Sequence, residues 1–147
     1  ALGTWMTNIE FQLMHGNLGD TYLMNNTTCE SAALQNDSTS KFTYTPGAPL
    51  LSFGEHANGR SVKKSADAEN LPGEWNTVEL FCVGSTAVHV VNGIAVMVNQ
   101  NTGLFESGVI QSLTSGKIQI QSEGAELYIK SIEIRPIRKF PEEIIPR

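Results

Sequence analysis

A turn signal at Asn92-Gly93 constrains the fold of this chain more than any other local feature. The residues on either side, 87–91 and 94–98, are short runs in which apolar side chains dominate. A two-residue type I′ turn needs positive φ at both central positions, and asparagine and glycine adopt positive φ most readily. The sequence therefore predicts an antiparallel β-hairpin across residues 87–98.

Alternating segments of the same kind recur along the chain, and none shows a sustained helical period. Strands are expected in seven further segments: residues 8–14, 21–24, 42–44, 50–53, 76–83, 117–121 and 126–135. Three polar stretches between them, residues 25–40, 54–72 and 99–115, are expected to be long loops. Many short strands without intervening helices predict an all-β fold of antiparallel strands, a sandwich first and an up-and-down barrel second.

Length and charge narrow the class of protein. A chain of 147 residues is long enough for one domain with a core of its own. We expect residues 1–139 to form that domain and residues 140–147 to be a C-terminal tail laid over its surface. A net charge of −5 without a basic stripe argues against a nucleic-acid partner. No apolar run in the sequence is long enough to predict a membrane span.

The two cysteines indicate no metal site. Cys82 falls in a predicted strand, where a buried free thiol is the usual environment, and Cys29 falls in a predicted polar loop. Neither cysteine has the Cys/His spacing of a structural zinc site. The sequence leaves open whether the two cysteines form a disulfide.

Polar side chains share faces of several predicted strands. Alternation that turns Ile118 and Ile120 inward turns Gln119 and Gln121 to the opposite face. The polar members of the other strands, by the same rule, are Glu10, Gln12 and Glu79. In one sheet they would form a polar shelf suited to sugar hydroxyls, whereas periodicity alone favours ordinary solvent-facing side chains.

Other side chains are candidates for chemistry or for sugar contact. The carboxylates available for acid–base work are Glu10, Asp20, Glu55, Glu79 and Glu123. His15 and His56 lie in predicted loops near acidic residues, where each suits a general base or a metal ligand, whereas His89 suits a packed position. Aromatic rings that could lie flat against a sugar are Trp5, Trp75 and Tyr128, although the place of Trp75 at a strand entry favours a core position.

Five segments together resemble a known family. They are Gly-Glu-Trp-Asn-Thr at 73–77, Val-Asn-Gly at 91–93, residues 116–136, Ile-Glu-Phe-Gln at 9–12 and Gly-Asp at 19–20. Taken in their order along the chain, they resemble the 3-keto-disaccharide hydrolases, formerly the domain of unknown function 1080. The resemblance covers most of the chain and implies a concanavalin A-like jelly-roll sandwich.

The chain departs from the family in two places. Family members usually carry several strands before the segment that opens this chain. The resemblance therefore implies a lost N-terminal segment, strands that a partner chain supplies to complete the sandwich, or one sheet left with an exposed edge. Many relatives also have Asp-His after the glutamine equivalent to Gln121, where this chain has Ser122-Glu123. That difference puts the role of the relatives' histidine in question here.

The resemblance also implies a function and a set of site residues. The activity would be that of a hydrolase or lyase acting on glycosides oxidised at C3, in the periplasm or outside the cell, on an oligosaccharide or glycoside ligand. The residues assigned as catalytic are Glu10, Asp20 and Glu123. The resemblance points to Gln12 and Gln121 for substrate binding. The strand and loop pattern adds Gln119, Glu79 and His15 to them. The base would be a carboxylate or a histidine, and the ketone would be polarised by hydrogen bonds or by a divalent metal.

Two other classes of function fit the same residues. A non-catalytic carbohydrate-binding module would show an open groove with aromatic platforms and no paired titratable groups. A structural or assembly domain would use an exposed sheet edge to bind another chain.

Overall fold

The structure is a computed structural model that describes residues 5–122 and 124–144. It confirms the all-β antiparallel fold, because the described residues contain ten strands, one 3₁₀ turn and no α-helix. The elements are β1 (Asn8–Phe11), β2 (Thr21–Met24), β3 (Thr27–Gln35), β4 (Phe42–Tyr44), β5 (Leu50–Phe53), β6 (Ser61–Val62), β7 (Val78–Val83), β8 (Thr86–Val91), β9 (Ile94–Glu106), β10 (Val109–Ser112) and η1 (Glu142–Ile144).

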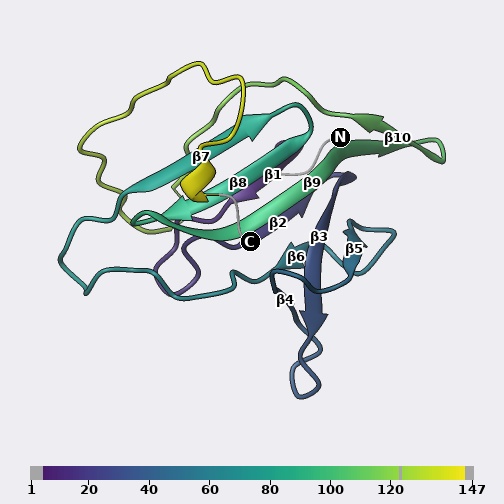
Figure 1. The fold of residues 1–147 in the computed structure, drawn as a ribbon, viewed down its shortest axis with the longest axis horizontal. Helices are drawn as coiled ribbons and strands as arrows, with labels where there is room; N and C mark the ends of the chain where they lie inside the picture. The colour runs from purple at the N-terminus through teal and green to yellow at the C-terminus, as the bar shows by residue number, and fades with distance from the viewer. Residues whose placement is uncertain (1–4, 123, 145–147) are drawn as a thin grey trace.

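The strands form two sheets (Figure 1). The smaller has the order β1-β2-β6, and the larger has the order β4-β3-β9-β8-β7, with β5 added on β3 and β10 on β9. Every pair of strands that forms a ladder runs antiparallel. β7 and β1 each end a sheet, so each carries one edge without a neighbouring strand among the described residues.

The two sheets pack face to face over an apolar core. Leu23 and Val62 of the smaller sheet join Phe53 and Met97 of the larger in one buried cluster. A second cluster holds Leu18 against β8 and β9. This arrangement is the sandwich expected from the sequence and is consistent with a jelly roll.

The hairpin at Asn92-Gly93 is confirmed. Val91 pairs with Ile94 across the turn, and the two central residues have φ of 49° and 80°. The Asn92 side chain also fixes the neighbouring segments, because its Nδ2 donates to Ala68 O and its Oδ1 accepts from Thr77 N. The turn residue therefore holds both its own hairpin and the loop before β7.

The prediction that residues 25–40 form a loop is wrong, because they contain the long central strand β3. Its inward positions hold Thr27, Cys29 and Ser31, which gave no apolar alternation. The hydroxyl of Thr27 donates to Asn8 O, and that of Ser31 donates to Val98 O. These bonds allow small polar side chains to lie in the core at low cost.

The prediction that residues 99–115 form a loop is also wrong. β9 continues as far as Glu106, and Ser107 and Gly108, both with positive φ, turn the chain into β10. Asn99 and Thr102 are buried in β9. Polar residues at inward positions again concealed the strand.

The predicted strands at 117–121 and 126–135 are absent from the described residues 113–122 and 124–139. In Figure 1 this green-to-yellow segment forms an open arch beyond β7. Ile118 is 72% exposed and Ile134 is 78% exposed, so the expected inward face packs against nothing comparable to the core. The chain returns to the sandwich at Phe140 and Ile144, which pack against Val88 and Val90 of β8.

Both cysteines are free thiols. Cys29 is buried in β3, and this burial, with a smaller contribution from nearby Glu30, raises its pKa to about 12. Cys82 is exposed on β7, so the expectation of a buried thiol there is wrong. Within the described residues, no helix has the length and apolar character needed to cross a bilayer.

Candidate functional site

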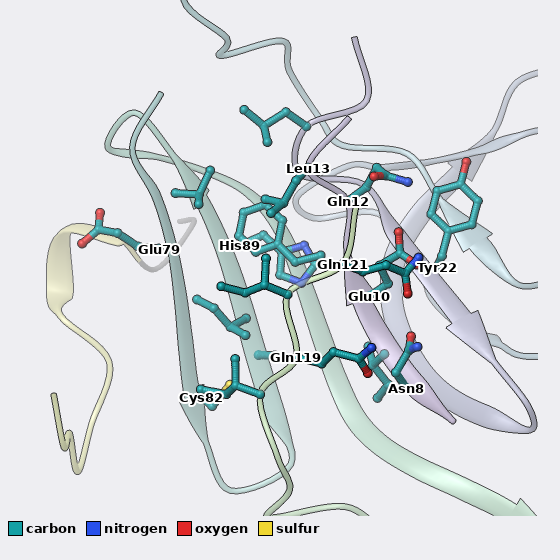
Figure 2. A pocket seen from close by; sticks show the side chains of 18 of the residues that line it. Asn8, Glu10, Gln12, Leu13, Tyr22, Glu79, Cys82, His89, Gln119 and Gln121 are labelled. Carbon is teal, nitrogen blue, oxygen red and sulfur yellow. The ribbon is translucent and has the colours of Figure 1, made fainter. Parts of the chain in front are cut away.

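A large open cleft lies against β1, β7 and the segment after β10 (Figure 2). Its volume is about 3150 Å³, and residues of the segment 113–137 form much of its wall. Pockets for small ligands usually measure roughly 300–1,000 Å³. The cleft therefore has room for a disaccharide without any rearrangement of the strands.

β1 presents its polar side chains to the cleft because of strand alternation. Ile9 packs into the core between the sheets, and Phe11 packs into the second buried cluster. The polar side chains that alternate with them, those of Asn8 and Glu10 in β1 and of Gln12 directly after it, line the cleft, and the apolar Ile9 and Phe11 border the same cleft from the other face of the strand. The division of this strand into an apolar and a polar face is as the sequence predicts.

The polar side chains of β1 are joined by others from different parts of the chain. Tyr22 of β2 is the register partner of Glu10 and lies on the same face. Gln119 and Gln121 line the same cleft, and in Figure 2 they point toward Asn8 and Glu10. We call Asn8, Glu10, Gln12, Tyr22, Gln119 and Gln121 the polar cluster. It combines a carboxylate, a phenol and four amides.

Two amides of the polar cluster differ in what they can offer a ligand. Gln12 Oε1 accepts a hydrogen bond from Met14 N at 3.0 Å, so its carbonyl end holds the turn and its NH₂ group is the available donor. Asn8 Oδ1 is buried and has no hydrogen-bond partner among the described residues. A buried acceptor without a donor is costly, so it suits a hydroxyl donor from a ligand or water.

Three predicted site residues that the structure describes are not in the polar cluster, namely Glu79, Asp20 and His15. Glu79 is on edge strand β7, on the face of Phe81, and Figure 2 shows its side chain on the far side of that strand from Glu10, pointing away from the polar cluster. Asp20 is 1% exposed and does not line the cleft. Its carboxylate pairs with Lys63 Nζ at 2.6 Å and accepts from Lys64 N at 2.9 Å. Glu123 lies outside the described residues.

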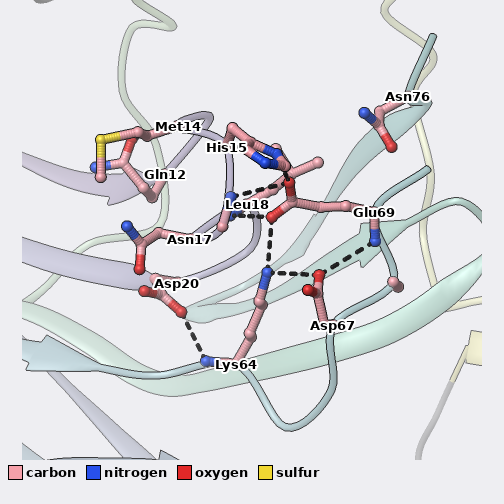
Figure 3. Close-up of polar contacts among 12 residues, drawn as sticks. Gln12, Met14, His15, Asn17, Leu18, Asp20, Lys64, Asp67, Glu69 and Asn76 are labelled. Carbon is pink, nitrogen blue, oxygen red and sulfur yellow. Dashed lines mark hydrogen bonds and ion pairs between the residues drawn. The ribbon is translucent and has the colours of Figure 1, made fainter. Parts of the chain in front are cut away.

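His15 belongs to a second polar group at the turn after β1 (Figure 3). Its Nδ1 lies 2.7 Å from Glu69 Oε2, and the same oxygen accepts from Gly16 N at 3.0 Å. The other oxygen of Glu69 accepts from Leu18 N at 3.1 Å and pairs with Lys64 Nζ at 2.8 Å. Both His15 and Glu69 line the cleft.

Glu69 was not predicted from the sequence. Its partners lie up to 54 positions away, and residues 54–72 gave no periodic pattern. Burial disfavours the charge of Glu69, but the bonds from Lys64, Gly16, Leu18 and His15 outweigh burial and lower its pKa to about 2. Burial likewise opposes the charge of Lys64, and its bonds to Glu69 and Asp67 outweigh this and raise its pKa.

His89 is the packed histidine that the sequence predicts. It is 2% exposed and stacks on Phe11 with ring centroids 4.2 Å apart. Its Nδ1 lies 3.0 Å from Gly19 O, which makes Nδ1 the donor, and its Nε2 lies 3.4 Å from Asn99 Nδ2. Burial lowers the pKa of His89 to about 4, although the bond to Gly19 opposes this. The ring is therefore neutral near pH 7.

The aromatic candidates lie on the surface of the cleft. Trp5 is 37% exposed, Trp75 is 57% exposed and Tyr128 is 72% exposed, and all three line the cleft. The core position expected for Trp75 is therefore wrong. The Trp75 backbone carbonyl accepts a hydrogen bond from Asn70 Nδ2 at 2.9 Å. Among the described residues, no group of three or more His, Cys, Asp or Glu side chains is placed to hold a metal ion.

The chain was compared with protein families, with curated proteins and with solved structures, and the first comparison identifies its family. A family model described as the 3-keto-alpha-glucoside-1,2-lyase-like domain matches residues 3–135. The comparisons with curated proteins and with solved structures found no match. The matched residues contain both sheets and every member of the polar cluster. The chain thus belongs to the 3-keto-alpha-glucoside-1,2-lyase-like domain family, whose function is carbohydrate-active.

Proposed function

We propose that this protein cleaves glycosides oxidised at C3, and that the polar cluster is the reaction site. The observation that supports this is the placement of one carboxylate, Glu10, among amides and a phenol on a roomy cleft. Amides and phenols suit the paired donors and acceptors of sugar hydroxyls. A carboxylate among them supplies the proton transfer that a binding site alone does not need.

The chemistry follows from the ketone at C3. The carbonyl acidifies the hydrogen at C2, so a base removes that proton and the electron pair moves into the enolate. The enolate then re-forms the ketone, C1 becomes doubly bonded to C2, and the C1–O bond to the leaving group breaks. Addition of water across the C1–C2 double bond completes the hydrolysis.

Glu10 is assigned the removal of the proton at C2. The NH₂ group of Gln12 and the amides of Gln119 and Gln121 would bind hydroxyls and polarise the ketone, and Asn8 Oδ1 would accept from a hydroxyl. His15, on the turn that lines the cleft, is also assigned to substrate binding. Buried Asp20 would not contact the substrate. Its ion pair with Lys63 would hold in place the turn that carries His15.

Turnover of a 3-keto-glucoside tests the proposal. Glu10→Gln keeps the shape of the side chain and removes the base, so we expect kcat to fall by about 10²–10⁴-fold. Glu106→Gln, at the exposed end of β9 and outside the cleft, is the matched control and should leave kcat unchanged. Equal activity of Glu10→Gln and the wild-type protein would refute the assignment of Glu10.

A non-catalytic carbohydrate-binding module is the second candidate. The exposed rings of Trp5, Trp75 and Tyr128 on the cleft favour it, because flat rings bind sugar faces. No turnover of any 3-keto-glucoside, together with glycan binding that is lost in Trp75→Ala, would establish the binding module in place of the enzyme.

A further inference from the structure

The pair of His15 and Glu69 differs from an ordinary surface ion pair in how its carboxylate is held. The Glu69 side chain is 5% exposed, whereas the His15 side chain is 75% exposed. Two backbone amides and Lys64 fix the carboxylate in addition to the imidazole. Surface pairs contribute little because both side chains move freely, but here one partner is fixed before the other binds.

The fixed carboxylate occupies one ring nitrogen of His15, so the other nitrogen is available for proton transfer with a ligand. Nδ1 is held by Glu69, and Nε2 has no partner among the described residues. A carboxylate on one imidazole nitrogen sets the ring's orientation and leaves the other nitrogen to exchange protons with a ligand. Since His15 lines the same cleft as Glu10, such a ligand would be the substrate.

The charged side chains around His15 have a net negative charge. Lys64 carries +1 and lies between Asp67 and Glu69, which carry −1 each, so these three groups sum to −1. Lys63 and Asp20, on the other side of the turn, cancel one another. The charges fixed around the His15 ring therefore sum to −1, and its Nδ1 lies 2.7 Å from the Glu69 carboxylate.

We propose that His15, positioned by Glu69, is the general acid that protonates the leaving oxygen during glycoside cleavage. This assignment rests on the function proposed above. That reaction needs a proton delivered at the C1 oxygen as well as one removed at C2. Glu10 and His15 both line this cleft, and because they are five residues apart in the chain their Cα atoms are at most roughly 18 Å apart.

The proton transfers balance over both steps. In elimination, Glu10 takes the C2 proton, His15 Nε2–H gives its proton to the departing oxygen, and the C1–O bond breaks. In hydration, neutral His15 takes a proton from the water that attacks C1, and Glu10 returns its proton to C2. Both residues then regain their starting state, and no oxidant or reductant is needed.

Dependence on the leaving group tests the assignment. Two 3-keto-glucosides are compared, one with an alkyl alcohol as leaving group and one with 4-nitrophenol, which departs without protonation. In His15→Gln we expect kcat/KM for the alkyl glucoside to fall by about 10²-fold or more, and for the nitrophenyl glucoside by less than about fivefold. His56→Gln, which alters an exposed histidine stacked on Phe105, is the matched control and should affect neither substrate.

The outcomes separate this assignment from the proposed function. Equal losses on both substrates in His15→Gln would mean that His15 only shapes the site, and no loss on either would mean that it takes no part; each result overturns the assignment. If the wild-type protein turns over neither substrate, the proposed function fails and the assignment fails with it. Glu69→Gln should repeat the selective loss on the alkyl glucoside, and rescue of that activity by Glu69→Asp would support positioning by the carboxylate.

Discussion

The β8–β9 hairpin and residues 113–139 carry the same kind of sequence but have different structures. Both alternate apolar and polar side chains. In the hairpin, β7 and β3 lie on either side, and Val90, Val91 and Val96 are fully buried. The described residues 113–122 and 124–139 contain no strand, and Ile118 stays 72% exposed.

The difference shows what alternation does and does not determine. Alternation decides which side chains share a face, but a strand also needs a neighbouring edge for its hydrogen bonds and a surface for its apolar face. The hairpin has both. The segment after β10 has neither among the described residues, although its glutamines still reach the cleft.

Hydrogen exchange should show the largest contrast between the two regions. Amides of β8 and β9 open only with much of the sandwich, so we expect them to exchange at least about 10³-fold more slowly than amides of 117–121 and 126–135, relative to unfolded rates. Mass spectrometry of peptides from both regions gives the ratio. Protection of 117–121 equal to that of β8 would show that the segment is paired in solution.

The buried histidine of the hairpin should make stability depend on pH. Burial lowers the pKa of His89 from 6.5 to about 4, so the unfolded chain binds the proton more tightly. This contribution is complete above about pH 6.5 and is lost as the pH falls toward 4. Between pH 6.5 and 4.5 we expect a loss of roughly 2 kcal/mol.

Urea unfolding across this interval measures the loss, and it avoids the range below 4.5 where Glu69 contributes. An NMR titration in which the His89 ring is still neutral at pH 5 would assign the loss to His89. A free energy of unfolding that does not change between pH 6.5 and 4.5 would contradict the prediction.

Truncation of one apolar side chain in each region should give unequal losses. Val90 is 0% exposed, so Val90→Ala should lower the free energy of unfolding by about 2 kcal/mol. Ile118→Ala removes more atoms but from an exposed site, and should change it by less than about 0.5 kcal/mol. Comparable losses in urea unfolding would mean that Ile118 packs against something in solution.

The sequence predicts apolar strands well and fails where polar groups are buried or where strands lack partners. The alternation of β1 and the Asn92-Gly93 turn are local features, and both predictions were confirmed. β3 was missed because Thr27 and Ser31 face the core and are satisfied by bonds to distant carbonyls. Such bonds depend on the tertiary structure and leave no periodic trace.

Site residues, too, were predictable where the signal is local and were missed where it depends on the tertiary structure. Alternation correctly puts Glu10 and Gln12 on one face, and both line the cleft, where Gln119 and Gln121 join them although their predicted strand is absent. Glu69 gave no sequence signal, because its importance comes from four partners that the fold assembles around it. Its environment was therefore predictable only from the structure.

The smallest expected effect is on substrate affinity, through Gln121 in the strand-free segment after β10. If Gln121 binds a sugar hydroxyl beside Glu10, Gln121→Ala removes one hydrogen bond of about 0.5–1.5 kcal/mol and weakens binding of a 3-keto-glucoside by about three- to tenfold. Gln111→Ala on β10, an exposed amide outside the cleft, is the matched control and should leave the affinity unchanged.

Calorimetry measures both affinities, and hydrogen exchange of 117–121 with and without ligand gives an independent test. Binding through Gln121 orders the segment, so its amides should become more protected in the complex than in the free protein. Unchanged affinity in Gln121→Ala, together with unchanged exchange, would mean that the segment lies beside the cleft without taking part in recognition. The polar cluster would then consist of β1 and β2 alone.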